Sequence, residues 1–224
     1  MEEAIYKAAR HAMVENQIKG RGITDPLVLR AVGIVPRHLF VEESYRPESY
    51  NDCTLPIGYG QVMSSPYVTA MMIELLELRG DEKVLEIGTG SGYATAVLAE
   101  IAGKVFTIER YSKLAQRARL VLSQLGYRNI VVKVGDGSLG WESHAPYDAI
   151  MVTAAGPRIP ISLINQLSDY GRMVMPVGSL DSQNLFLVRR LNSKVEIDVI
   201  EMDDCVFAPL VGEDAWLKEY RKLL

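Results

Sequence analysis

The sequence predicts an α/β protein whose sheet is mostly parallel and ends in an antiparallel hairpin. Short, continuous apolar runs such as KVLEI at 83–87 alternate with helical segments, which is typical of a parallel sheet covered by helices on both faces. The last two apolar runs, 184–191 and 194–202, flank Asn192-Ser193, which indicates an antiparallel hairpin.

Each remaining element follows the same alternation. Apolar residues recur at helical spacing near the N-terminus, and Asp25 followed by Pro26 is an N-cap and first-turn signal for a second helix. Helices are expected at 2–18, 26–35, 66–78, 93–101, 111–125 and 160–168, and strands at 83–87, 104–108, 130–134, 147–153 and 171–177, so that the two hairpin strands complete a seven-stranded sheet. Residues 44–65 show no periodicity, so we expect a long ordered loop, which in a compact domain is usually functional.

Composition and charge fit one domain over residues 1–224, with an N-terminal helical extension over about 1–50. The chain is 48% hydrophobic, and its net charge of −4 argues against a nucleic-acid groove, which needs clustered Lys and Arg. No apolar run resembles a signal peptide or is long enough to span a bilayer, so we expect no membrane partner. Cys53 and Cys205 can pair in principle, but two thiols are more typical of a reduced, cytoplasmic protein.

A strand, a glycine-rich loop and a helix form the strongest motif, VLEIGTGSGYATAVLAE at 84–100. The strand ends at Ile87, and Gly88, Gly90 and Gly92 follow at G-x-G-x-G spacing. Glycine adopts backbone torsions that other residues resist and lets a ligand lie against the main chain. Taken alone, the pattern also fits a tight turn without a ligand.

Acidic residues around this loop favour a nucleoside ligand. Glu109 ends the next strand, about 20 residues past the first glycine, where an acid accepts hydrogen bonds from ribose hydroxyls; the alternative is an ordinary exposed acid. Glu86 suits a cationic ligand, unless it is a strand residue facing solvent. In the GDG turn, Asp136 can accept from an adenine amino group while the Gly137 N–H donates to a ring nitrogen, or Asp136 caps the following helix.

The loop differs from a dinucleotide fingerprint because Tyr93 stands where G-x-G-x-x-G needs its third glycine. That glycine packs a helix whose N-terminus receives a pyrophosphate. S-adenosylmethionine has no phosphate, and a parallel sheet finished by a hairpin resembles the Rossmann-like fold of class I methyltransferases. The sequence therefore indicates an S-adenosylmethionine-dependent methyltransferase.

Several motifs resemble one family, the protein-L-isoaspartate (D-aspartate) O-methyltransferases. The segment LPIGYGQVMSSP at 55–66 is similar to the family's P-I-G-x-G-Q-x-x-S-x-P, and VLEIGTGSGY is similar to its cofactor motif. In the same order follow IER at 108–110, GDGSLGW at 135–141, APYDAIMVTAA at 145–155, GRMVMPVG at 171–178 and FAPLVGEDAW at 207–216. The sequence departs from the family at Val62-Met63 and at Cys205-Val206, which bears on the preferred flanking sequence of the substrate.

The resemblance implies methyl transfer from S-adenosylmethionine, which becomes S-adenosylhomocysteine, to the α-carboxylate of isoaspartyl residues in damaged proteins and peptides. The ester then collapses to a succinimide that opens partly to aspartate. Ser64 matches the family's active-site serine, where it orients the carboxylate, although Ser64 or Ser65 also fits a helix N-cap. The implied cofactor-binding residues are Glu86, Gly88, Thr89, Gly90, Gly92, Glu109, Arg110, Asp136 and Gly137, and the implied substrate-binding residues are Ile57, Gly58, Gln61, Ser64 and Val206.

This chemistry needs neither a metal nor a general base, because a carboxylate with a pKa near about 4 is already an anion at neutral pH. The three histidines, His11, His38 and His144, are scattered and show no metal-ligand spacing. Four alternatives remain open: a methyltransferase for a small molecule or RNA, a nicotinamide-dependent oxidoreductase, a serine hydrolase, and a module that only senses S-adenosylmethionine. The 55–66 segment speaks against the first, Tyr93 against the second, and Thr89 against a G-x-S-x-G hydrolase motif.

Overall fold

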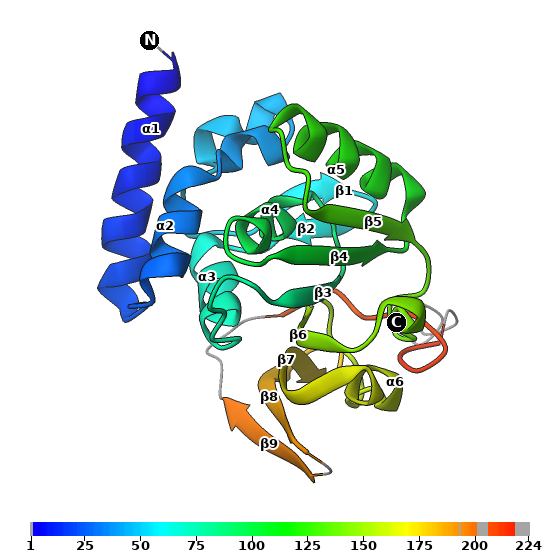
Figure 1. Cartoon of the computed structure of the whole chain (residues 1–224). Coiled ribbons are helices and arrows are strands. Elements are labelled where there is room, and N and C mark those ends of the chain that lie inside the picture. Colours follow the sequence, from blue (N-terminus) through cyan, green and yellow to red (C-terminus); the bar gives the residue numbers. More distant parts are fainter. Residues whose placement is uncertain (1, 193, 201–205, 218–224) are drawn as a thin grey trace.

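A computed structural model describes residues 2–192, 194–200 and 206–217 and has the expected α/β architecture. Ser193 of the expected hairpin turn and Cys205 lie outside the described residues. A central seven-stranded sheet carries helices on both faces, and the N-terminal helices lie along one side of it (Figure 1).

The sheet has the strand order β5-β4-β3-β6-β7-β8-β9. Its strands are β3 (Lys83–Ile87), β4 (Lys104–Glu109), β5 (Ile130–Val134), β6 (Tyr147–Val152), β7 (Leu167–Gly178), β8 (Gln183–Leu191) and β9 (Lys194–Ile200). The pairs from β5 to β7 are parallel, and β8 pairs antiparallel with β7 and β9. The parallel sheet finished by an antiparallel hairpin is therefore confirmed. The strand order reverses between β3 and β6, and such a switch point opens a crevice at the carboxyl ends of the strands.

Alternating side chains of the strands feed two apolar layers. Val84 and Met151 belong to a layer shared with the helices α2 (Pro26–Ile34), α3 (Pro66–Glu74), α4 (Tyr93–Ala99) and α5 (Ser112–Gln124). Leu85 and Ile150 belong to the opposite layer, which α6 (Ile161–Asn165) and residues 210–215 cover. This alternation is the period of two that a strand imposes, and it explains why the strands read as continuous apolar runs.

The N-terminal region begins with α1 (Glu2–Ala12), which continues as the π-helix η1 (Met13–Ile18) and the 3-10 turn η2 (Lys19–Arg21). Gly22 ends it with a left-handed φ of 99°. Asp25 caps α2 as predicted, accepting hydrogen bonds from two backbone N–H groups of the first turn. Two further 3-10 segments, η3 (Arg37–Phe40) and η4 (Glu43–Glu48), lead to the segment expected as a loop.

That segment is more regular than predicted. Strands β1 (Leu55–Gly58) and β2 (Gln61–Met63) pair as a small antiparallel hairpin, so the expectation of a long ordered loop without strands up to residue 65 was wrong there. Tyr59 and Gly60 form the turn with left-handed φ values of 57° and 68°. The hairpin is too short to show the periodicity of two by which a strand is recognised in a sequence.

Two other boundaries also differ from the expectation. The helix expected at 160–168 is only Ile161–Asn165, and β7 begins at Leu167 instead of 171. The early start of β7 brings Leu167 opposite Tyr147 at the beginning of β6. A 3-10 turn, η5 (Glu142–His144), precedes β6.

The C-terminal segment, residues 206–217, returns across the carboxyl ends of β3 and β6 (Figure 1). Ala155, just after β6, donates its N–H to Ala208 and accepts from the N–H of Leu210, at 2.8 and 2.7 Å. The side chains of Phe207 and Leu210 in this C-terminal segment are nearly fully buried. The segment therefore forms a fixed wall beside the sheet crevice.

Candidate active site

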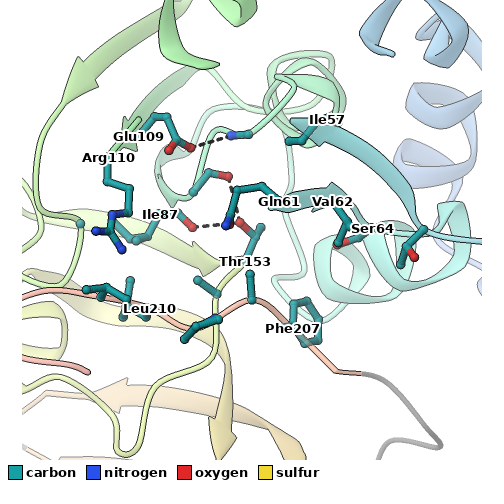
Figure 2. Close-up of a pocket in the computed structure, with 18 of the residues that line it drawn as sticks. Ile57, Gln61, Val62, Ser64, Ile87, Glu109, Arg110, Thr153, Phe207 and Leu210 are labelled. Atoms are coloured by element: carbon teal, nitrogen blue, oxygen red, sulfur yellow. Dashed lines mark hydrogen bonds between the residues drawn. The ribbon is translucent and has the colours of Figure 1, made fainter. Parts of the chain in front are cut away.

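A cavity opens at the carboxyl ends of β3, β4 and β6, between the β1–β2 hairpin and the C-terminal segment (Figure 2). Glu109 and Arg110 lie on one side of it, Val62 and Ser64 on another, and Phe207 and Leu210 along the C-terminal segment. Of the residues predicted for the site, those that line this cavity are Ile57, Gln61, Ser64, Gly88, Gly90, Glu109, Arg110, Gly137 and Val206.

The glycine-rich loop forms the floor of the cavity after β3. Gly88 has a left-handed φ of 99°, and a Cβ atom there would overlap the Thr153 hydroxyl. That hydroxyl donates to the backbone carbonyls of Ile87 and Gly88, at 3.0 and 2.9 Å. The Gly88 N–H donates to Ile108 O at 2.8 Å. Only glycine fits this turn, so the motif has a structural reason as well as a place in the cavity wall.

Glu109 ends β4, as the sequence predicted, and it also faces the glycine-rich loop. Its carboxylate accepts from the N–H of Gly90 at 2.9 Å and from the N–H of Tyr111 at 2.8 Å, one on each oxygen. The side chain is only 5% exposed. Burial raises the pKa of Glu109, and the backbone donors oppose that rise. Each oxygen keeps a second lone pair that can accept a hydroxyl hydrogen bond.

Glu86 lies beneath the loop and outside the described lining of the cavity. It is fully buried, so it does not face solvent, and Thr95 and Thr107 both donate to its Oε2. The Thr89 hydroxyl donates to the Thr107 hydroxyl at 2.6 Å, because the Thr107 hydroxyl already donates its own hydrogen to Glu86. Burial raises the pKa of Glu86 to about 7, with the Thr107 and Thr95 bonds opposing and Glu109 adding to the rise.

Three other predicted positions do not line this cavity. Gly92 is the N-cap of α4 with a φ of 91°. Gly58 is the last residue of β1, with a φ of 93°. Thr89 lines a second, adjacent cavity, which shares Val62, Ser64, Gly88, Gly90 and Thr153 with the first. The roles predicted for Glu86 and for these three residues stay predictions.

The residues of the GDG turn contact two different parts of the protein, the cavity and the C-terminal segment. Gly137 lines the cavity, whereas Asp136 does not. The Asp136 carboxylate accepts from the N–H and hydroxyl of Ser138 on Oδ1, at 2.9 and 2.7 Å, and from the N–H of Glu213 on Oδ2, at 2.8 Å. A Cβ atom on Gly212 would overlap this carboxylate. Asp136 therefore fastens the C-terminal segment in this structure, and the adenine contact predicted for it stays a prediction.

The two serines at the start of α3 have different surroundings. Ser65 is the N-cap of the helix, and its hydroxyl accepts from the Val68 N–H at 3.4 Å. Ser64 precedes the cap, and its backbone carbonyl accepts from the buried Arg37 at 2.6 Å. Gln61 donates to Gly60 O at 3.1 Å within the hairpin turn. The sequence left open which serine caps the helix, and the structure assigns that position to Ser65.

Sequence reasoning missed part of the cavity wall. Thr153 follows β6 at the switch point, and its place at the end of the strand next to β3 is the signal that could have identified it. The other lining residues not predicted individually are Thr54, Val62, Ser65, Val68, Ile87, Ile108, Ala154, Phe207, Ala208, Pro209, Leu210 and Val211. Most are apolar residues that meet only in the folded chain.

Two absences among the described residues bear on other classes of function. The described residues contain no group of three or more His, Cys, Asp or Glu side chains placed to hold a metal ion. In the same part of the chain, no helix is both long and apolar enough to cross a membrane.

Comparison with known proteins identifies the family. Residues 8–215 match the family model described as protein-L-isoaspartate (D-aspartate) O-methyltransferase. The chain is 49% identical over 212 residues to the protein-L-isoaspartate O-methyltransferase of Syntrophus aciditrophicus, covering 94% of this chain and 97% of that one. It is 51% identical over 215 residues to the enzyme of that name from Petrotoga mobilis, covering 94% and 99%.

Solved structures show the same fold. One protein-L-isoaspartate O-methyltransferase superposes with a TM-score of 0.81 at 27% identity, covering 96% of this chain and 70% of that one. A putative enzyme of this type from Plasmodium falciparum, in complex with S-adenosyl-L-homocysteine, superposes with a TM-score of 0.76 at 21% identity, covering 89% and 97%. On the family model and the curated relatives, this chain belongs to the protein-L-isoaspartate (D-aspartate) O-methyltransferase family.

Proposed function

We propose that the protein is an S-adenosylmethionine-dependent carboxyl O-methyltransferase that acts on L-isoaspartyl residues of damaged proteins and peptides and so begins their repair through a succinimide. The observation that carries this is the convergence of three segments on one cavity: the β1–β2 hairpin with Ser64, the glycine-rich loop, and the C-terminal segment. A methyltransferase needs a cofactor site and an acceptor site that meet at one point, and these segments supply both.

The residues present fit S-adenosylmethionine. Glu109 offers lone pairs to two ribose hydroxyls, and the backbone of Gly88 and Gly90 leaves room for a ligand against the main chain. The Gly137 N–H and the apolar side chain of Val211 suit an adenine ring at the same wall. When bound, S-adenosylmethionine supplies an electrophilic methyl group to the substrate and leaves as S-adenosylhomocysteine.

The protein's part in the reaction is to hold the substrate carboxylate in line with that methyl group. The isoaspartyl α-carboxylate is an anion at neutral pH, so no protein group has to remove a proton. Ser64 donates its hydroxyl to the carboxylate at the positive N-terminal end of α3, a helix of nine residues. Correct placement at close approach is itself a large source of rate acceleration.

The substrate backbone lies between the hairpin and the C-terminal segment. Ile57 and Gln61 approach it from one side, and Val206, which is 55% exposed at the rim, from the other. We further propose that the enzyme works in the cytoplasm, as one domain with its N-terminal extension, and has neither nucleic acid nor membrane as a partner. The acidic net charge of −4 supports the first of these exclusions.

Transfer of a labelled methyl group to paired peptides tests this function. The peptides share one sequence and differ only in an L-isoaspartyl or an L-aspartyl residue. We expect base-labile incorporation into the isoaspartyl peptide and none into its twin. Equal labelling of both, or labelling of RNA or a small acid instead, would point to another acceptor, and cofactor binding without transfer would point to a sensing module.

A further inference from the structure

A buried arginine lies directly behind Ser64. The Arg37 side chain is completely buried in η3. Its Nη2 donates to the backbone carbonyl of Ser64 at 2.6 Å, and its Nε donates to that of Ser49 at 2.7 Å. The Tyr93 ring faces the guanidinium, with 4.5 Å between Arg37 Cζ and the ring centroid. Arg37 thus joins the N-terminal extension, the start of α3 and the glycine-rich loop region.

The charge on Arg37 has no carboxylate partner in the described part of the chain. Its Nη1 and the Tyr93 hydroxyl are both buried and make no hydrogen bond of regular geometry among those residues, although the two side chains interact with each other. Burial lowers the pKa of Arg37, but a guanidinium stays protonated in proteins. A buried cation without a carboxylate partner is costly, and an apolar side chain of similar size would pack at a lower free-energy cost. Arg37 therefore places near Ser64 a positive charge that no described carboxylate neutralises.

The hydrogen bond to Ser64 also fixes the orientation of a peptide group. In a trans peptide the carbonyl and the next N–H point in opposite directions. Because Arg37 holds the Ser64 carbonyl on the buried side, the Ser65 N–H points away from Arg37. Ser64 and Ser65 both line the main cavity, and Ser64 and Tyr93 both line the adjacent one. The Ser64 carbonyl is thus held on the side away from the cavity, while Ser64 and Ser65 still line the cavity wall.

The support of Arg37 comes from the N-terminal extension. Tyr6 of α1 stacks on His38, with 4.0 Å between ring centroids, and His38 Nδ1 lies 2.7 Å from the Tyr50 hydroxyl. Tyr50 follows Ser49, whose carbonyl accepts from Arg37. Helix α1 therefore contacts His38, the neighbour of Arg37, and Arg37 in turn contacts Ser64 in the cavity wall.

We propose that Arg37 is a positioning residue for methyl transfer: it fixes the Ser64–Ser65 peptide group for the substrate carboxylate and adds an unpaired positive charge behind it. This rests on the proposed role of Ser64 in binding an isoaspartyl carboxylate. The proposal gives the N-terminal extension a part in catalysis, because the extension carries Arg37 and the residues that hold it.

Arg37→Gln and Arg37→Lys test the proposal. The glutamine removes the charge, and the lysine keeps it but cannot bond both carbonyls in the same geometry. We expect Arg37→Gln to lower kcat/KM for an isoaspartyl peptide by about 10- to 100-fold, the range for one hydrogen bond to a charged group. Arg37→Lys should lose less, and both should bind S-adenosylhomocysteine as the unchanged protein does. Arg30→Gln is the matched control, since Arg30 also donates to a backbone carbonyl, that of Glu100, but at an exposed site.

A double-mutant cycle with Ser64→Ala separates positioning from a merely structural role. The part of the Arg37 effect that passes through the Ser64 hydroxyl disappears in the Ser64→Ala background, so Arg37→Gln should lower kcat/KM by a smaller factor there than in the unchanged protein. An equal loss in both backgrounds, or a parallel loss of S-adenosylhomocysteine affinity, would overturn the proposal. Should Arg37→Gln not fold, full activity of Arg37→Lys would overturn the need for the bidentate geometry. A wild-type enzyme that labels no isoaspartyl peptide would instead overturn the proposed function itself.

Discussion

Ser65 accepts a hydrogen bond from the Val68 N–H and thereby caps α3, while the preceding Ser64 is left to face the cavity. This division gives the two serines different expected phenotypes. We expect Ser64→Ala to lower turnover of isoaspartyl peptide by roughly 10²-fold, as removal of a donor to a reacting anion does. Its affinity for S-adenosylhomocysteine should be unchanged.

Ser65→Ala is the matched control for that experiment. It should cost about 1 kcal/mol of unfolding free energy, the usual value of an N-cap, with a much smaller effect on turnover. Steady-state kinetics, thermal unfolding and calorimetric cofactor titration on both variants give the comparison. Normal turnover by Ser64→Ala together with failure of Ser65→Ala would reverse the assignment of the two hydroxyls.

Glu109 is expected to hold the cofactor. Glu109→Ala should weaken both S-adenosylmethionine and S-adenosylhomocysteine, by at most about 1.5–3 kcal/mol for each lost hydrogen bond to a charged acceptor. Glu109→Gln keeps one oxygen acceptor and should lose less. Calorimetric titration measures both, with the exposed Glu142→Gln as control. Unchanged affinity in a folded Glu109→Ala protein would exclude Glu109 from the cofactor site.

Glu86 makes stability depend on pH in a direction unusual for an acid. Its pKa of about 7 in the folded state, raised by burial, lies above the ordinary value of 4.5. The folded state therefore binds the Glu86 proton more tightly than the unfolded state does. The stabilisation of the folded state that results is complete below about pH 4.5 and is lost as the pH rises toward 7. Glu86→Gln mimics the protonated form and removes that loss.

We therefore expect the unfolding free energy of Glu86→Gln, relative to the unchanged protein, to rise by up to about 3 kcal/mol between about pH 5 and pH 8. Urea unfolding at the two pH values measures this, and Glu142→Gln should show no such trend. A relative stability that stays constant or falls with rising pH would show that Glu86 is ionised in the folded protein throughout.

Asp136 and Gly212 are packed too closely to admit another atom. Gly212→Ala would place its Cβ against the Asp136 carboxylate and the Ser138 hydroxyl. We expect a loss of about 1–3 kcal/mol of stability, as for other overpacked sites, together with weaker cofactor binding because the C-terminal segment must shift. Gly33→Ala is the control, since its Cβ would lie 3.9 Å from the nearest atom, in ordinary contact. If Gly212→Ala matches Gly33→Ala, the segment is not fastened there.

Methyl transfer should need no metal. A carboxylate nucleophile requires neither a Lewis acid nor an activated water, so treatment with EDTA is expected to leave the rate unchanged. The measurement is transfer to isoaspartyl peptide before and after chelation and desalting. Loss of activity that zinc or magnesium restores would contradict the direct-transfer mechanism.

Local sequence patterns predicted the parallel strands because a buried strand must be apolar on both faces. The runs at 83–87 and 130–134 match β3 and β5 to the residue. The β1–β2 hairpin escaped prediction because its strands have only four and three residues, and its turn depends on Tyr59, which has a positive φ that its residue type does not suggest. The length of α6 was likewise set by the pairing of β7 with β6.

The candidate site was predictable where neighbouring strands of the predicted sheet bring the residues together. Gly88 and Glu109 lie at the ends of adjacent parallel strands, so their proximity follows from the strand alternation. Arg37 was not predictable, because its contact with Ser64 spans 27 residues and two 3-10 segments with no periodic pattern. Asp136 shows the same limit, since its bond to Glu213 joins parts of the chain 77 residues apart.

The late position of the C-terminal segment has a consequence for synthesis on the ribosome. The glycine-rich loop and β3–β6 are complete once residue 153 has been made, but the wall formed by Val206–Val211 is not. Folding during translation proceeds from the N-terminus, so a growing chain presents the loop and Ser64 without the opposite wall. Nascent chains stalled before residue 206 should therefore be catalytically silent, and methylation begins only when translation has passed this segment.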